Sequence, residues 1–169
     1  MTNRGFIIVL LTLLAGVLSC SDKTQKDEPE GQTNAKQMIA TTATLKAISE
    51  AFNRHDLDAI MEFFSDDCTL DFPRGPEAWG QRFIGKAQVR EGLACRFKGI
   101  PDVHYGDDSH WVSADGNKGV SEWTLTGTTV AGIPVKVRGC DLWEFRDGKI
   151  TRKNSFWKIV EPANQPASK

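Results

Sequence analysis

The sequence predicts an α+β domain in which helices come first and antiparallel strands follow. Apolar residues recur at helical spacing between residues 39 and 97, and two-residue alternation takes over from Val103 onward. Turn-rich segments separate the alternating runs, as in a meander of strands. At 169 residues, the chain is long enough for one domain with its own hydrophobic core.

The expected helices lie in the first half of the domain. Asp56 follows a break in the helical pattern and suits the N-cap of a short helix from Leu57 to Phe64. A further helix is expected between Gly85 and Phe97. The first helix is predicted from apolar residues at Ile39, Leu45, Ile48, Ala51 and Phe52.

The expected strands begin after a turn at Ser65-Asp66-Asp67. Cys68 to Phe72 predicts a strand that Pro73 ends. Alternation and turn residues then predict four strands, at Val103–Val112, Gly119–Thr128, Val135–Phe145 and Ile150–Val160.

Asp141 is the first candidate for function. Its strand alternates so that Asp141 shares a face with Val137, Trp143 and Phe145, while charged residues take the other face. A fold that turns the polar face outward holds this carboxyl group in an apolar row, where ionisation is disfavoured. The alternative is a structural aspartate that pairs with Asn154 or with a backbone amide.

The N-terminus predicts export. Residues 1–19 carry one charge, Arg4, and an apolar run typical of a secretory signal. The following Val17-Leu18-Ser19-Cys20 resembles a bacterial lipobox, which implies a lipidated Cys20 and a domain anchored to a membrane of the cell envelope, outside the cytoplasm. An ordinary cleaved signal is the alternative. Residues 20–37 are expected to be a flexible tether, 38–160 the folded domain and 161–169 a disordered tail.

Charge excludes nucleic acid as an expected partner. When residues 1–19 with Arg4 are removed, 20 of the 21 basic residues remain beside 22 acidic ones, so the remaining chain is close to neutral. It has no basic stripe with interleaved aromatic residues.

Cys68, Cys95 and Cys140 are expected to be buried thiols, with one disulfide as the alternative. Asp107-Asp108 is interpreted as a solvated turn. No metal site is expected, because the histidines have no ligand spacing and are expected to be exposed: His55, His104 and His110.

Two segments carry a family resemblance: AFNRHDLDAIMEFFSDDCTLDFP, at residues 51–73, and CDLWEFRDGKI, at residues 140–150. Together with the order of elements, they resemble the SnoaL-like branch of the nuclear transport factor 2-like superfamily over residues 40–160. The resemblance implies a cone-shaped fold, with N-terminal helices packed on a curved antiparallel sheet around an apolar pocket. The superfamily includes isomerases, polyketide cyclases, epoxide hydrolases and binding domains, so the fold alone does not assign an activity.

The resemblance also implies roles for particular residues. In the ketosteroid isomerase pattern, Asp141 falls on the oxyanion side and the base falls at Phe72 or Asp71. The tyrosine donor of that pattern falls at Ile48, which cannot donate a hydrogen bond, so steroid isomerisation is disfavoured. The epoxide hydrolase relay would end at Asn154, which cannot take a proton. The pocket acid of SnoaL-like cyclases falls at or close to Asp141.

Three functions follow from these assignments. The first is binding of a small apolar or amphipathic molecule, and the second is acid-base enzyme chemistry by Asp141 on an apolar carbonyl compound. The third is partner binding or homodimerisation through the outer face, which carries Cys140 and Leu142. No cofactor is expected, and the lipid anchor is the only expected membrane contact. The candidate residues are Asp141 and Asp71 for catalysis, Asp71 alternatively lying at the surface or rim, and Trp123, Trp143, Asn154 and Phe72 for ligand binding.

Overall fold

Helices and a curved sheet enclose the core of this chain, and the computed structural model describes residues 39–161. The expected signal segment 1–19, Cys20 with the tether 20–37, and the tail from residue 162 onward lie outside the described residues. No helix within residues 39–161 is long and apolar enough to cross a membrane.

Helix α1 (Thr42–Asn53) packs one apolar face against the sheet. Thr41 caps its first turn through a reciprocal pair of hydrogen bonds with Thr44. The helix therefore begins after Ile39, which is exposed rather than part of the buried face. The buried face consists of Leu45, Ile48, Ala51 and Phe52.

The next two helices lead into and out of the first strand. Asp56 caps α2 (Leu57–Glu62), as expected, and accepts a hydrogen bond from the Ala59 amide at 3.0 Å. The helix ends before Phe64 and the expected turn at Ser65-Asp66-Asp67 is absent, because these residues already belong to strand β1. Helix α3 (Lys86–Gly99) places Val89, Gly92 and Leu93 in the interior.

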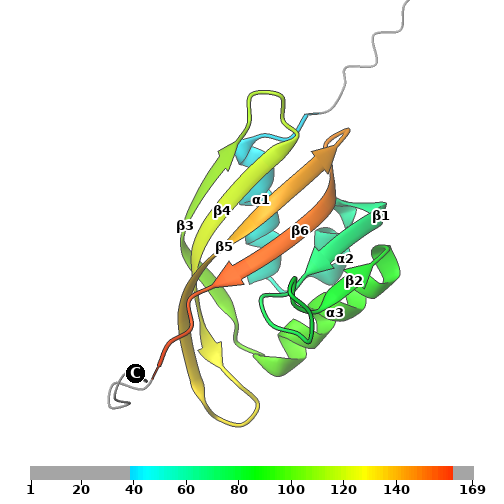
Figure 1. The fold of residues 1–169 in the computed structure, drawn as a ribbon. Helices are drawn as coiled ribbons and strands as arrows, with labels where there is room; N and C mark the ends of the chain where they lie inside the picture. The colour runs from blue at the N-terminus through cyan, green and yellow to red at the C-terminus, as the bar shows by residue number, and fades with distance from the viewer. Residues whose placement is uncertain (1–38, 162–169) are drawn as a thin grey trace, which may run out of the picture. The chain divides into compact units, whose positions relative to one another are not determined.

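Within residues 39–161, six strands form one sheet in the order β2-β1-β6-β5-β4-β3. The expected α+β class is confirmed, and Figure 1 shows α1 packed behind a sheet that curves around it. One pair departs from the expected antiparallel sheet: β1 enters beside the last strand, β6, and runs parallel to it. The strands are β1 (Phe64–Asp71), β2 (Arg82–Ile84), β3 (His104–Val112), β4 (Lys118–Thr128), β5 (Pro134–Arg146) and β6 (Lys149–Trp157).

The core fills the space between α1 and the inner face of the sheet. Its main cluster joins α1 to β1, β5 and β6, and a smaller cluster of Ile100, Val103, Trp123 and Leu125 lies beside it. Gly139 in β5 lets the indole of Trp123 cross this strand, since a Cβ at residue 139 would lie 2.4 Å from that ring. The position of Trp123 therefore depends on a glycine in the neighbouring strand.

The three described cysteines are free thiols. Cys68 is buried, as expected, and Cys140 is half-buried. The expectation of burial is wrong for Cys95, which is exposed on α3.

Candidate functional site

Asp141 lies on the inner face of β5, where strand alternation predicted it. Trp143 and Phe145 share this face, and all three side chains are buried. Trp123, predicted to face inward from β4, is buried as well. The apolar row around the carboxyl group is therefore present in the folded domain.

The Asp141 carboxylate is nevertheless fully partnered. The Trp123 indole N–H donates to its Oδ2 at 2.9 Å, and the Ser155 hydroxyl donates to its Oδ1 at 2.6 Å. The Lys153 ammonium group also donates to Oδ1 and to the Ser155 oxygen. Burial lowers the pKa of Lys153, while the adjacent carboxylate opposes that shift. The interior thus holds an ion pair, and sequence reasoning missed its cation.

A β-bulge in β6 explains why Lys153 and not Asn154 faces the interior. The ladder with β5 pairs Phe145 with Ile150 but Glu144 with Arg152, so one extra residue enters β6 at Thr151. The extra residue reverses the inward and outward positions that follow. The expectation that Asn154 shares the interior with Asp141 is therefore wrong: Asn154 pairs with the outward-facing Leu142.

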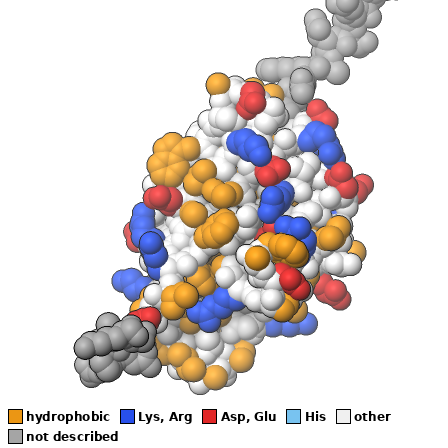
Figure 2. Space-filling view, in the orientation of Figure 1, with side chains coloured by type: hydrophobic (Ala, Val, Ile, Leu, Met, Phe, Trp, Pro, Cys, Tyr) orange, Lys and Arg blue, Asp and Glu red, His pale blue; other side chains and the backbone are white. Residues whose placement is uncertain are grey.

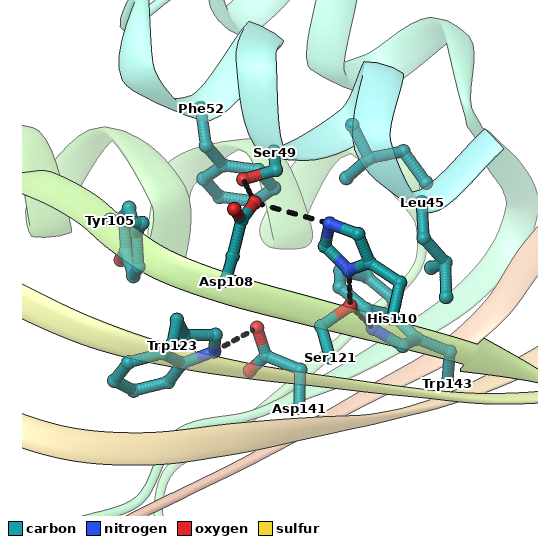
Figure 3. Close-up of a pocket in the computed structure, with 11 residues that line it drawn as sticks. Leu45, Ser49, Phe52, Tyr105, Asp108, His110, Ser121, Trp123, Asp141 and Trp143 are labelled. Carbon is teal, nitrogen blue, oxygen red and sulfur yellow. Dashed lines mark hydrogen bonds and ion pairs between the residues drawn. The ribbon is translucent and has the colours of Figure 1, made fainter. Parts of the chain in front are cut away.

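A second polar network borders the same interior. The Nε2 of His110 lies 3.1 Å from Oδ2 of Asp108, and its Nδ1 lies 2.9 Å from the Ser121 oxygen (Figure 3). The Ser49 hydroxyl on α1 donates to the same Asp108 oxygen at 2.7 Å, and the Trp143 indole N–H donates to Ser121 at 2.9 Å. The Ser49 hydrogen bond, with the nearby imidazole, lowers the pKa of Asp108 despite partial burial.

This network corrects two expectations. His110 is not exposed but lines a pocket, and Asp107-Asp108 is exposed as expected but is part of strand β3 rather than a turn, with Asp108 beside His110. The ladder between β3 and β4 pairs Gly106 with Thr124 and Ser109 with Glu122, which leaves both aspartates opposite Trp123 alone. This bulge, with Asp107 in the left-handed region at φ 49°, brings Asp108 to the pocket and His110 opposite Ser121.

The two networks meet in one cavity, which we call the upper cavity. It has an empty volume of about 330 Å³, part of it open to solvent, with room for about one water molecule in this conformation. Figure 3 shows Asp141, Ser121, His110 and Asp108 along one wall and α1 on the other. The apolar lining is Leu45, Ile48, Phe52, Tyr105, Trp123 and Trp143.

A lower cavity of about 320 Å³, also part open to solvent and with room for about one water molecule in this conformation, lies on the other side of three shared rings, those of Phe52, Tyr105 and Trp123. Phe72, predicted to bind ligand, lines this lower cavity, as do Lys153 and Ser155. The Tyr105 hydroxyl group, whose pKa is raised by burial, has no hydrogen-bond partner within residues 39–161. Sequence reasoning missed Tyr105, since a tyrosine in an alternating strand is most often part of the core.

Asp71, the second catalytic candidate, lies elsewhere. Register pairs it with Asn154, so its side chain is on the outer face of the sheet, where Arg82 and Arg152 cover it completely. Burial alone would raise its pKa, but the hydrogen bonds from the two arginines prevail and hold the pKa low. Asp71 is therefore not a surface or rim residue, and the structure does not bring it together with Asp141.

The site can support proton transfer without a metal. Within residues 39–161, no three histidine, cysteine or acidic side chains come together to hold a metal ion. His110 has a carboxylate on one ring nitrogen and a hydroxyl on the other, an arrangement that can take up and return a proton.

Comparison with known proteins gives a family and a fold. The family model described as "SnoaL-like domain" matches residues 45–153. No curated protein matches the chain.

Three solved structures show the fold. A "putative polyketide cyclase" from Xanthomonas campestris pv. campestris is 25% identical, with a TM-score of 0.62, over 69% of this chain and 89% of that one. A second protein so described, from Pseudomonas putida KT2440, is 21% identical, with a TM-score of 0.65, over 72% and 94%. A "putative isomerase" from Bacillus subtilis is 24% identical, with a TM-score of 0.59, over 69% and 84%.

Proposed function

This chain belongs to the SnoaL-like domain family, and from that premise we propose that it is an acid-base enzyme acting on a small apolar carbonyl compound, with His110 as the group that moves the proton. The observation that carries the proposal is the His110 imidazole, held between Asp108 and Ser121 in a cavity whose remaining lining, apart from Ser49 and Asp141, is aromatic and aliphatic. The descriptions of its structural neighbours as polyketide cyclases and an isomerase are compatible with such chemistry.

The hydrogen bonds define a direction for proton transfer. Asp108 is acceptor-only when ionised, so it favours the tautomer of His110 with its proton on Nε2. The Nδ1 atom then accepts from the Ser121 hydroxyl, which faces the upper cavity. A proton that reaches His110 through Ser121 leaves an imidazolium ion paired with the Asp108 carboxylate, which lowers the cost of that charge.

Asp141 acts in this proposal as a positioning residue. Its carboxylate fixes the indole of Trp123 through one oxygen and is neutralised by Lys153 through the other. Trp123 is one of the three rings between the cavities. Because the upper cavity holds about one water molecule, a substrate requires these rings to rotate and join the two cavities.

The test is deuterium incorporation at the α-carbon of neutral ketones, with 2-tetralone and cyclohexanone as probes, followed by NMR in D₂O. We expect the protein to accelerate this exchange and His110→Gln to lower the acceleration by about 10²–10⁴-fold, the usual contribution of a general acid or base. His104→Gln is the matched control, since His104 lies on the same strand with an exposed side chain. Equal exchange by wild type and His110→Gln would exclude this role of His110.

Binding without turnover, the first function expected from the sequence, is the second candidate. It is favoured by the aromatic lining and by the complete pairing of Asp141 and His110 among the described residues, neither of which then needs to react. The same ketones separate the two functions. Ligand-dependent rise of the melting temperature without deuterium exchange supports binding, and exchange supports the enzyme.

Export and anchoring are proposed from the sequence. The lipobox-like Val17-Leu18-Ser19-Cys20 supports a protein lipidated at Cys20 and attached to a membrane of the cell envelope, with its domain outside the cytoplasm. Expression in a Gram-negative host with labelled palmitate tests this. We expect label in the membrane fraction, and its loss in Cys20→Ser.

Homodimerisation is proposed through the outer face of the sheet. Leu142 and Phe156 are 42% and 49% exposed on this face, and Figure 2 shows hydrophobic side chains gathered there. Burial of such a patch between two copies would remove apolar area from water. Sedimentation velocity tests it: we expect a dimer in the wild type and a monomer in Leu142→Glu.

A further inference from the structure

The lower cavity lies next to the protein surface. A surface groove of about 570 Å³, part of it open to solvent, lies beside the lower cavity, and the two share the residues Phe72, Pro73, Arg96 and Trp157. Arg74 also lines the groove and lies over the Trp157 ring. We call Phe72, Arg74, Arg96 and Trp157 the mouth. Any ligand that enters the lower cavity from the groove passes these four side chains.

The arginine in the middle of the mouth is held but not neutralised. The guanidinium carbon of Arg96 lies 4.9 Å from the ring centre of Phe72 and 4.8 Å from that of Trp157. Arg74 lies 5.6 Å from the Trp157 ring centre. Within residues 39–161 neither arginine forms an ion pair or a side-chain hydrogen bond, whereas five others pair with carboxylates: Arg82, Arg90, Arg138, Arg146 and Arg152.

The charges behind the mouth supply no counterion for Arg96 or Arg74 among residues 39–161. Lys153 lines the lower cavity beyond Arg96, and the nearby Arg96 contributes to lowering the pKa of its ammonium group, after burial itself. Asp141 balances Lys153, so the charges of Arg96 and Arg74 are left without a counterion among the described residues. A planar guanidinium group fixed between two rings is preorganised to bind a carboxylate through two parallel hydrogen bonds.

We propose that the ligand of this protein is an aromatic carboxylate, whose acid group binds Arg96 and Arg74 at the mouth and whose apolar body enters the lower cavity against Tyr105 and Trp123 when these two rings rotate to enlarge it. The identification of this ligand with the substrate rests on the proposed function, but binding at the mouth does not require turnover. The flat rings of Phe72 and Trp157 favour an aromatic body beside the acid group.

The experiment compares 2-naphthoate with its neutral analogue 2-naphthamide by isothermal titration calorimetry. We expect wild type to bind naphthoate about tenfold or more tightly than naphthamide, since a hydrogen-bonded charge pair contributes that much. Acetate and inorganic phosphate are the further probes. Binding of either as tightly as naphthoate would overturn the proposal, because the site would then recognise a bare anion and not an aromatic carboxylate.

Variants locate the recognition. We expect Arg96→Gln to weaken naphthoate about tenfold without changing naphthamide, and Arg74→Gln to weaken it less. Arg96→Lys keeps the positive charge and should retain part of the preference for naphthoate over naphthamide. This variant also shows whether the weakening in Arg96→Gln comes from the lost charge or from a folding defect. Arg54→Gln is the matched control, an exposed arginine at the end of α1. Equal affinity for naphthoate and naphthamide in wild type, or equal weakening of both in Arg96→Gln, would overturn the proposal.

The naphthoate-binding test and the ketone-exchange test can fail independently of each other. Preferential naphthoate binding through Arg96, with ketone exchange unaffected by His110→Gln, retains the mouth and rejects the acid-base role. Ketone exchange that depends on His110, without preference for naphthoate, retains the enzyme and rejects the carboxylate ligand.

Discussion

Two buried carboxylates, Asp71 and Asp141, lie on opposite faces of the same sheet and have different surroundings. Asp71 accepts hydrogen bonds at 2.6–3.1 Å from Arg82 and Arg152, and it lines neither interior cavity. Asp141 binds an ammonium, a hydroxyl and an indole group and borders the upper cavity. Burial and charge pairing are common to both, so neither property marks a functional carboxylate. The adjoining cavity is what distinguishes Asp141.

The partners of the two carboxylates differ in their access to water. The Arg82 and Arg152 side chains are 33% and 35% exposed, whereas the Lys153 side chain is 8% exposed. Water can solvate either arginine if Asp71 is lost, whereas the Lys153 and Asp141 side chains are only 8% and 6% exposed and gain much less solvation when the partner is lost. The interior pair should therefore be the more costly one to break.

The largest expected effect is that of Lys153→Met. This change leaves the Asp141 carboxylate buried without a cation, which costs about 3–5 kcal/mol in comparable pairs. The measurement is the free energy of unfolding from urea titration at pH 7. Lys118→Met is the matched control, since Lys118 forms an exposed pair with Glu144 and should cost about 0–1 kcal/mol. Similar losses in the two variants would remove the distinction between the interior and the surface.

The double variant Asp141→Leu/Lys153→Met sharpens the same comparison. Both charges are removed together, so we expect about half or more of the stability lost in Lys153→Met to return. Asp141→Leu alone is a poorer test, because it leaves Lys153 buried and unpaired. Restored stability with lost ketone exchange would show that the pair is kept for function.

Asp71→Asn has a smaller expected effect. The amide cannot accept the four charged hydrogen bonds, but its arginines become solvated, so we expect a loss of about 2 kcal/mol at pH 7. Since the folded pKa of Asp71 is lowered, its contribution is fully present above the unfolded pKa of about 3.9 and is lost as pH falls through the folded pKa. Urea titrations should show the same difference from wild type at pH 7 and pH 5 and a smaller difference at pH 3.5. A constant difference would contradict the charge pairing.

Sequence patterns predicted most of the fold and some of the side chains that line the candidate site. Alternation correctly turned Asp141, Trp123 and Trp143 inward, because β4 and β5 pair over their length without a bulge between residues 118–128 and 134–144. Periodicity also located the three helices and the four C-terminal strands. The short strand β2 was missed, since Arg82–Ile84 is too short to show a pattern.

The remainder of the site depends on two bulges, which alternation cannot reveal. Each adds one residue to a strand and reverses the facing of those that follow. The bulge at Asp107 and Asp108 brings His110 to the pocket, and the bulge at Thr151 brings in Lys153. The one local signal is Gly106 followed by aspartate, a residue that tolerates the left-handed conformation of Asp107. Lysine is rarely buried unless it is paired with an acidic group, so the sequence alone does not predict a buried Lys153 without knowledge of its partner Asp141.

The smallest expected effect, that of Trp123→Phe, tests whether the Asp141 carboxylate is charged in its resting state. The change keeps a ring and removes the N–H that Asp141 accepts, while Lys153 and Ser155 remain, so we expect a loss of about 1 kcal/mol beyond the change in ring size. Trp143→Phe is the matched control, since it removes an N–H that bonds the neutral Ser121 hydroxyl from the adjacent strand. A hydrogen bond to a charged acceptor contributes more than one to a neutral acceptor, so Trp123→Phe should be the more destabilising variant in urea titration. When Asp141→Asn is also present, Trp123→Phe should no longer be more destabilising than Trp143→Phe, because each variant then removes a hydrogen bond to a neutral acceptor. Equal losses in the wild-type background would mean that Asp141 carries a proton and that Lys153 is uncharged.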